Sequence, residues 1–156
     1  MNGKRREILR AGGGMSVLAL ATAAGLVRPG NVSAQEWNKA AFDTRSFAEA
    51  LKALGGSGSA TSTLIQITAP DIAENGAIVP VLVEARLPKT QSISIIIEKN
   101  PNPLAGTFEI PDGTDAFVST RVKMAESSNV HVLVKADGKY FHAAKEVKVT
   151  LGGCGG

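Results

Sequence analysis

Cysteine and aromatic residues are scarce in this chain. Among 156 residues there is one cysteine, Cys154, so no disulfide can form within the chain. The two histidines, His131 and His142, stand in no HExxH or HxH spacing, and without a second cysteine we expect no metal site. Aromatic residues make up 4% of the chain, and no aromatic patch suited to stacking nucleic-acid bases is evident. No phosphate-binding loop or paired-carboxylate cleft appears either, so we expect no cofactor.

Long apolar runs are also missing. The longest, Met15 to Val27, is shorter than the roughly 20 residues that a membrane-spanning helix needs. It follows residues 5–10, Arg-Arg-Glu-Ile-Leu-Arg, which have the twin-arginine export pattern. Small residues at 32–34 offer a cleavage site. We predict that residues 1–34 are a twin-arginine signal peptide and that the processed protein is periplasmic and free of the membrane. An uncleaved membrane anchor is the alternative.

The full chain has a net charge of +3, and this positive excess disappears once residues 1–34 are removed. The full chain has 17 basic and 14 acidic residues, and the first 34 residues contain five of the basic ones and one of the acidic ones. The remaining chain has 12 basic and 13 acidic residues, which gives a net charge of −1. Nothing in this balance favours binding to nucleic acid or to an anionic membrane.

Residues 35–62 are predicted to be a helical segment and a linker. Phe47, Ala50, Leu51 and Leu54 recur at the spacing of one helix face, and Asp43 or Thr44 can cap its start. This face can bind a partner or pack on the chain's own β-domain, and we favour the second interpretation. The Gly/Ser-rich stretch 55–62 is predicted to be a mobile surface loop.

Residues 63–151 are predicted to form a β-sandwich domain. Seven runs alternate apolar and polar residues between Pro, Gly and Asp-Gly turn signals. The runs are residues 64–68, 78–87, 92–98, 104–110, 116–124, 130–135 and 140–151. Because no helix lies between them, we expect an all-β, immunoglobulin-like antiparallel sandwich. Pro80 suggests that its strand is at an edge or carries a bulge, and Leu151 is expected to face inward.

The last five residues, 152–156, surround the single thiol with glycine. Gly152 and Gly153 precede Cys154, and Gly155 and Gly156 follow it. Because glycine adopts almost any backbone conformation, we expect a flexible arm that presents the thiol. A thiol held this loosely is not preorganised for catalysis, and no basic residue lies nearby to activate it. We therefore predict that the chain is not an enzyme and that Cys154 is a site of covalent attachment.

A C-terminal Gly-Gly-Cys-Gly-Gly arm on a small exported β-rich chain resembles the SoxY family, the sulfur carriers of the periplasmic thiosulfate-oxidising Sox system. The resemblance implies that Cys154 carries sulfur intermediates and that the chain pairs with SoxZ. It also implies transient docking to the cytochrome SoxXA, the hydrolase SoxB and the sulfane dehydrogenase SoxCD.

Two other interpretations remain open on the sequence alone. An exported interaction module could form a disulfide-linked homodimer through Cys154, because an odd cysteine in an exported protein can pair between chains. A thiol redox enzyme would need a resolving cysteine, which the chain lacks and a partner would have to supply.

Overall fold

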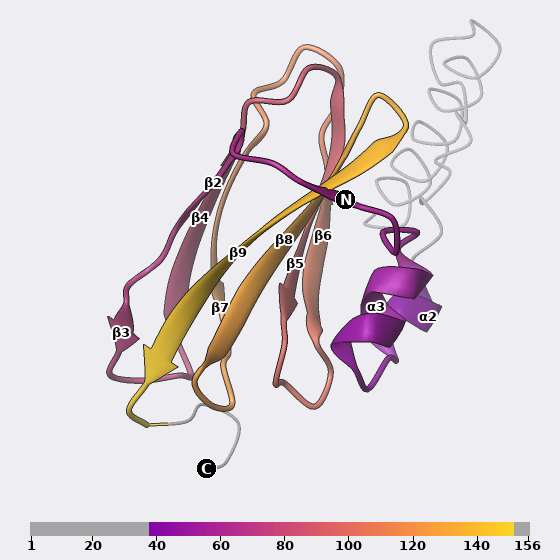
Figure 1. Ribbon diagram of the computed structural model, residues 1–156. Coiled ribbons are helices and arrows are strands. Elements are labelled where there is room, and N and C mark those ends of the chain that lie inside the picture. Colours follow the sequence, from indigo (N-terminus) through magenta and orange to yellow (C-terminus); the bar gives the residue numbers. More distant parts are fainter. Residues whose placement is uncertain (1–37, 152–156) are drawn as a thin grey trace, which may run out of the picture. The chain divides into compact units, whose positions relative to one another are not determined.

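The computed structural model describes residues 38–151, so the predicted signal peptide and the predicted arm lie outside the described residues. Two short helices and nine strands make up this part of the chain (Figure 1). In chain order they are α2 (Lys39–Phe42), α3 (Phe47–Ala53), β1 (Ala60–Thr61), β2 (Ile65–Thr68), β3 (Ile72–Ala73), β4 (Val79–Ala85), β5 (Thr90–Ile97), β6 (Leu104–Glu109), β7 (Phe117–Val122), β8 (Ser128–Ala136) and β9 (Lys139–Val149). Between residues 38 and 151 no helix is long and apolar enough to cross a membrane.

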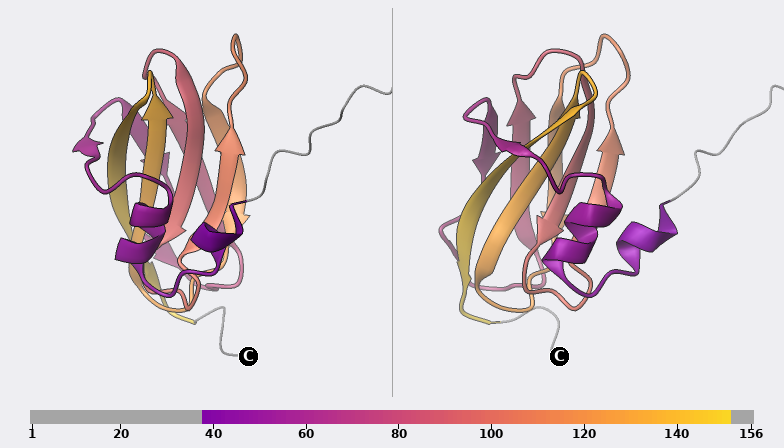
Figure 2. Two further views of the ribbon diagram at one scale, coloured as in Figure 1. Left: turned by 90° about the vertical axis from the view of Figure 1, so that its right-hand side faces the viewer. Right: turned by 45° about the vertical axis from the view of Figure 1, so that its right-hand side comes forward.

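The strands form two facing sheets, which confirms the predicted immunoglobulin-like sandwich. The larger sheet has the order β1-β9-β8-β5-β6, with β3 also pairing with β9, and the smaller has the order β2-β4-β7. The pairs among the seven longer strands are antiparallel. The turned views show the two helices beside the outer face of the larger sheet (Figure 2).

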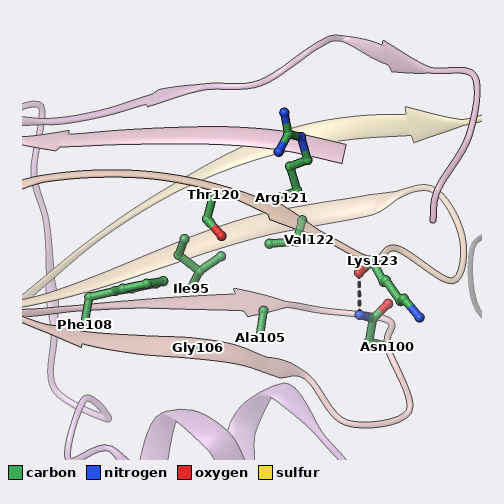
Figure 3. A pocket seen from close by; sticks show the side chains of 9 residues that line it. All are labelled: Ile95, Asn100, Ala105, Gly106, Phe108, Thr120, Arg121, Val122 and Lys123. Carbon is green, nitrogen blue, oxygen red and sulfur yellow. Dashed lines mark hydrogen bonds between the residues drawn. The ribbon is translucent and has the colours of Figure 1, made fainter. Parts of the chain in front are cut away.

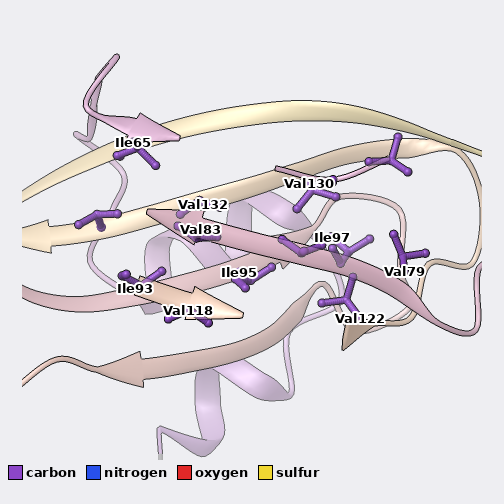
Figure 4. Packing of buried hydrophobic residues seen from close by; sticks show 14 of the residues in the cluster. Ile65, Val79, Val83, Ile93, Ile95, Ile97, Val118, Val122, Val130 and Val132 are labelled. Carbon is purple, nitrogen blue, oxygen red and sulfur yellow. The ribbon is translucent and has the colours of Figure 1, made fainter. Parts of the chain in front are cut away.

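The core lies between the sheets and follows the alternation of the sequence. Strands β4, β5 and β8 each contribute three side chains to this core with exposure of 1% or less, and Figure 4 labels most of them. They are Val79, Val81, Val83, Ile93, Ile95, Ile97, Val130, Val132 and Val134. Each such side chain contributes about 1.5–3 kcal/mol through burial, so these three strands make a rigid centre for the domain.

The hairpin between β8 and β9 forms where Asp137-Gly138 predicted it. Both residues have positive φ, 48° for Asp137 and 73° for Gly138, as a two-residue type I′ turn requires. Ala136 pairs directly with Lys139 across the turn, and nine residue pairs follow this register down to Ser128 and Val147. The turn therefore fixes which residues of β9 face the core.

Strand β4 corrects the prediction that Pro80 marks an edge strand or a bulge. It is the central strand of the smaller sheet, and its register with β7 is unbroken at Pro80. Pro80 pairs with Arg121 of β7 on one side. On the other side, β2 ends at Thr68, which pairs with Leu82. Because β2 stops short of Pro80, the missing N–H removes no bond to that strand.

The stretch 55–62 is not the mobile loop that its composition suggested. Ala60 and Thr61 form β1, which pairs in parallel with Phe141 and His142 of β9. Gly56 is buried, and a Cβ built on it would lie 2.6 Å from a methyl group of Leu133. The segment therefore fastens α3 to the larger sheet rather than separating the two.

Helix α3 packs on its own domain, as we favoured from the sequence. Ala50 is fully buried, and Phe47, Leu51 and Leu54 pack with it over Ile96 and Leu133 of the sheet. The predicted caps Asp43 and Thr44 are wrong, because the Ser46 side chain accepts a hydrogen bond from the Glu49 N–H at 3.3 Å. Gly55, with φ of 79°, ends the helix.

We expect Gly56→Ala to lower the free energy of unfolding by about 1–3 kcal/mol, because the new methyl group must displace the side chains of buried Leu133 and half-buried Leu51. Gly58→Ala is the matched control, since a Cβ there meets no atom within 4 Å and the backbone φ is not positive. Urea unfolding of the two variants measures the difference. Equal stabilities would show that the contact under α3 does not carry this energy.

Candidate functional site

The predicted attachment site, Cys154, and the arm glycines 152, 153, 155 and 156 lie outside the described residues. What the structure describes is the base from which they continue. Strand β9 ends at Val149, and Thr150 and Leu151 follow it. The site is therefore built from the contacts that hold these last described residues.

Hydrogen bonds hold the base from two sides. On one side, β3 pairs with β9, the Thr150 N–H donates to the Ala73 carbonyl at 3.1 Å, and the Thr150 hydroxyl donates to the Glu74 carbonyl at 2.9 Å. On the other side, the Ser127 hydroxyl accepts from the Val149 N–H at 2.8 Å. The chain is thus fixed up to the residue before the glycines.

Gly76 connects Leu151 to the end of β7. Its N–H donates to the Leu151 carbonyl at 2.7 Å, and its own carbonyl accepts from the Met124 N–H at 2.7 Å. These bonds place Leu151, the last described residue, beside the loops that follow β3 and β7. Any protein that contacts Cys154 must come close to the same loops, because three extended residues span only about 10 Å.

Leu151 does not face the core as predicted. Its side chain is 65% exposed, whereas Val147 of the same strand is fully buried. The sandwich ends near Val149, so the next alternate position has no opposite sheet to pack on. Ile72 and Ile78, from the segments on either side of Gly76, are each 60% exposed. Apolar side chains therefore remain accessible on the segments that hold the base of the arm.

The two histidines lie on the outer face of the larger sheet, away from the base of the arm. His131 stacks on Phe47 of α3 with ring centroids 4.2 Å apart. The two ring nitrogens of His142 lie 3.0 Å from the Ser59 hydroxyl and 3.2 Å from the Thr61 hydroxyl. Both rings therefore fasten the α3–β1 segment to the sheet, which is a structural role.

Burial dominates the electrostatics of His131. It lowers the pKa of the imidazole below its ordinary value of 6.5, while Glu98, 3.5 Å from Nε2, acts in the opposite direction and His142 adds a smaller lowering. Nε2 makes no hydrogen bond despite this short distance. A hydrogen bond from Asn129 at 2.8 Å lowers the pKa of the Glu98 carboxyl.

This arrangement predicts a loss of stability in mild acid. Because the folded-state pKa of His131 is below its unfolded value of 6.5, the unfolded chain binds this proton more readily. The contribution of neutral His131 to the free energy of unfolding is therefore fully present above pH 6.5, and it is lost as the pH falls through the folded-state pKa. Urea unfolding measures this at about pH 7.5 and about pH 5. Between these two pH values the free energy of unfolding should fall more for the unaltered chain than for His131→Gln. Equal drops would contradict this assignment.

Over residues 38–151, no group of three His, Cys, Asp or Glu side chains is placed to hold a metal ion. Of the residues that hold Leu151 and Val149, Ser127 carried no signal in the sequence, and Gly76 carried only the turn signal of the Asn75-Gly76 dipeptide. Their role depends on which loops meet at the end of β9, and this is a property of the sheet order. An Asx turn at Asn75, whose side chain accepts from the Ala77 N–H at 2.8 Å, was the one local indication of a turn there.

A family model and a solved structure that are similar to this chain both belong to SoxY. The family model described as sulfur oxidation protein SoxY matches residues 51–154. Among solved structures, the sulfur carrier protein SoxY from Chlorobium limicola f thiosulfatophilum is similar at 43% identity with a TM-score of 0.60. The match covers 66% of this chain and 94% of that one.

A superoxide reductase (neelaredoxin) from Ignicoccus hospitalis is similar at 18% identity with a TM-score of 0.49, over 55% of this chain and 79% of that chain. At this level the likeness supports neither a shared fold nor a shared activity. A search of curated proteins found no match.

Proposed function

The chain belongs to the SoxY family of sulfur oxidation proteins, and from this premise we propose that it carries sulfur covalently on Cys154. The family match supports this residue, because it extends through position 154 and the chain has no other cysteine. The solved relative is a sulfur carrier protein. The role of this chain is accordingly that of a carrier in sulfur oxidation and not that of an enzyme.

The proposed loading step joins the thiol to thiosulfate. Cys154–SH and S₂O₃²⁻ give Cys154–S–S–SO₃⁻, one proton and two electrons, and a cytochrome accepts the electrons. Water then cleaves the terminal sulfur–sulfur bond, releasing sulfate and a proton and leaving Cys154–S–SH. In this scheme the carrier supplies the thiol and the partner enzymes supply the redox and hydrolytic groups.

The proposed partners are those of the Sox system. SoxXA would load the thiol, SoxB would hydrolyse the conjugate, SoxCD would oxidise the remaining sulfane sulfur, and SoxZ would be the stable partner. Each enzyme would have to admit the same residues of this chain. Glycines on both sides of Cys154 suit this requirement, because they have no side chains that would obstruct a narrow channel.

Sox-system SoxY proteins are periplasmic, and we propose export of this chain by the twin-arginine route. Residues 5–10 support the route through their sequence pattern. Twin-arginine export of an already folded chain would allow a folded partner without a signal to accompany it. SoxZ is the proposed companion.

The carrier function is tested by the intact mass of the chain before and after incubation with thiosulfate and an oxidising Sox cytochrome. We expect an added mass of a thiosulfate unit that reductant removes and that peptide mapping places on Cys154. An unmodified thiol, or only a disulfide between two copies of the chain, would overturn the proposal. The second of these outcomes would favour the interaction module instead.

A further inference from the structure

A cleft of about 230 Å³ opens between β6, the edge of the larger sheet, and β7, the edge of the smaller one (Figure 3). Ile95, Phe108 and Val122 give it an apolar floor. Asn100, Thr120, Arg121 and Lys123 provide polar groups around it. The cleft therefore combines an apolar surface with cations at the open side of the sandwich.

The backbone that carries Lys123 is fixed at the mouth of this cleft. The Asn100 side chain donates to the Lys123 carbonyl at 2.7 Å and accepts from the Ala125 N–H at 2.9 Å. In Figure 3 the side chain of Lys123, which directly follows the end of β7, extends toward Asn100, whereas that of Arg121 extends in the opposite direction. One cation is thus directed toward the mouth of the cleft and the other away from it.

Lys123 has no ion-pair partner among residues 38–151, whereas two other lysines of the domain have one. Lys99 lies 3.8 Å from Glu126, and Lys145 lies 3.0 Å from Asp71. No carboxylate or hydrogen-bond acceptor in the described part of the chain contacts the Lys123 ammonium, and the side chain is exposed. Lys123 is therefore available to bind an anion from outside the described residues.

The arm begins within reach of this cation. Gly76 bonds to both Leu151 and Met124, and two hydrogen-bonded backbone spacings amount to about 10 Å. Cys154 is three positions after Leu151, and three extended residues span up to about 10 Å. Because Lys123 directly precedes Met124, a group on Cys154 can reach the Lys123 ammonium without any change in the domain.

We propose that Lys123, at the mouth of the β6–β7 cleft, binds the sulfonate group of the adduct on Cys154 of the same chain. This inference rests on the proposed function, which makes the loaded arm anionic, –S–S–SO₃⁻, whereas the free thiol is neutral. The loaded arm would then rest against the β6–β7 edge, and the unloaded arm would not. Loaded and unloaded carrier would therefore differ in the surface that is accessible to other proteins at the β6–β7 edge.

The contact must be weak enough for the enzymes to displace it. Ion pairs between exposed groups shift an equilibrium by about fivefold at most. Salt screens them over about 10 Å at 0.1 M ionic strength. The docked arm is therefore one side of a rapid equilibrium, and raising the salt concentration should release it.

The test uses the full chain labelled with ¹⁵N and loaded chemically, without any Sox enzyme. Cys154–SH reacts with tetrathionate to give Cys154–S–S–SO₃⁻, thiosulfate and a proton, and intact mass confirms loading. We expect loading to shift the amide resonances of Asn100, Gly106 and Lys123 in addition to those near Cys154. High salt should reverse the remote shifts.

Two variants and one ligand control make the result specific. Lys123→Gln should reduce the remote shifts about two- to fivefold. Arg121→Gln, two positions earlier at the end of β7 and also exposed, should retain them. Free thiosulfate added to the unloaded chain at equal concentration should give smaller shifts, since it lacks the tether. Remote shifts that are absent, or that survive in Lys123→Gln, would overturn the inference. Neither outcome bears on loading by Sox enzymes, which the mass experiment tests separately.

Discussion

Cys154→Ser is expected to reduce thiosulfate oxidation by a reconstituted Sox mixture to the level seen without this chain. A serine hydroxyl cannot form the sulfur–sulfur bond on which the proposed carrier cycle depends. The described core is built from residues between 65 and 149, so we expect the free energy of unfolding to change by less than about 0.5 kcal/mol. Thiosulfate-dependent electron release to the cytochrome measures the first effect, and urea unfolding measures the second.

A second variant tests whether the thiol must be at position 154 or whether any exposed thiol near this end of the domain is sufficient. Leu151→Cys combined with Cys154→Ser keeps one thiol on an exposed position, three residues closer to the domain. We expect this thiol to react with small alkylating reagents and yet not to restore turnover, because it is held by the contacts of the base. Restored turnover in this double variant would show that the glycine-flanked position is dispensable. Residual turnover in Cys154→Ser alone would count against the attachment site itself.

The largest effect on stability is expected for Ile95→Ala. Ile95 is fully buried between the sheets and pairs with Val132 on one side and Gly106 on the other. Removing its branched side chain loses burial and leaves a cavity, which costs about 2–5 kcal/mol. A domain of this kind has about 5–15 kcal/mol in total, so a substantial part of its stability would be lost.

Ile95→Val is the graded control, with an expected loss of about 0.5–1.5 kcal/mol. Urea unfolding followed by circular dichroism gives both values. If the alanine variant were no less stable than the valine variant, Ile95 would not be the tightly packed core residue that the structure shows. Ile95 also lines the floor of the β6–β7 cleft. The alanine variant can therefore be used to test binding of the Cys154 adduct at Lys123 only under conditions in which it remains folded.

The sequence predicted the parts of the fold that depend on local pattern. Alternation of apolar residues located β4, β5 and β8, because one side of each faces a continuous core. Asp137-Gly138 located the hairpin, because few other residues accept positive φ at both turn positions. The attachment site stays a prediction from composition, since Cys154 lies outside the described residues.

Features that depend on distant partners were not predictable. Strands β1 and β3 are two residues long and show no periodicity. Each forms because it pairs with β9, 81 positions later for β1 and 76 positions later for β3. Lys123 had no signal beyond its charge. Its significance comes from the absence of a described partner and from the bonds that Gly76 makes to Leu151 and Met124.

The placement of β9 has a mechanical consequence. The strand pairs through nine residues with β8 on one edge and with β1 and β3 on the other, and its direction is that in which the chain continues toward residue 152. The hydrogen bonds of antiparallel strands lie perpendicular to the strands. A pull on the following residues would therefore load these bonds together in shear instead of opening them one at a time. On the proposed function, an enzyme that binds Cys154 would apply its pull to a strand that is hydrogen-bonded on both edges.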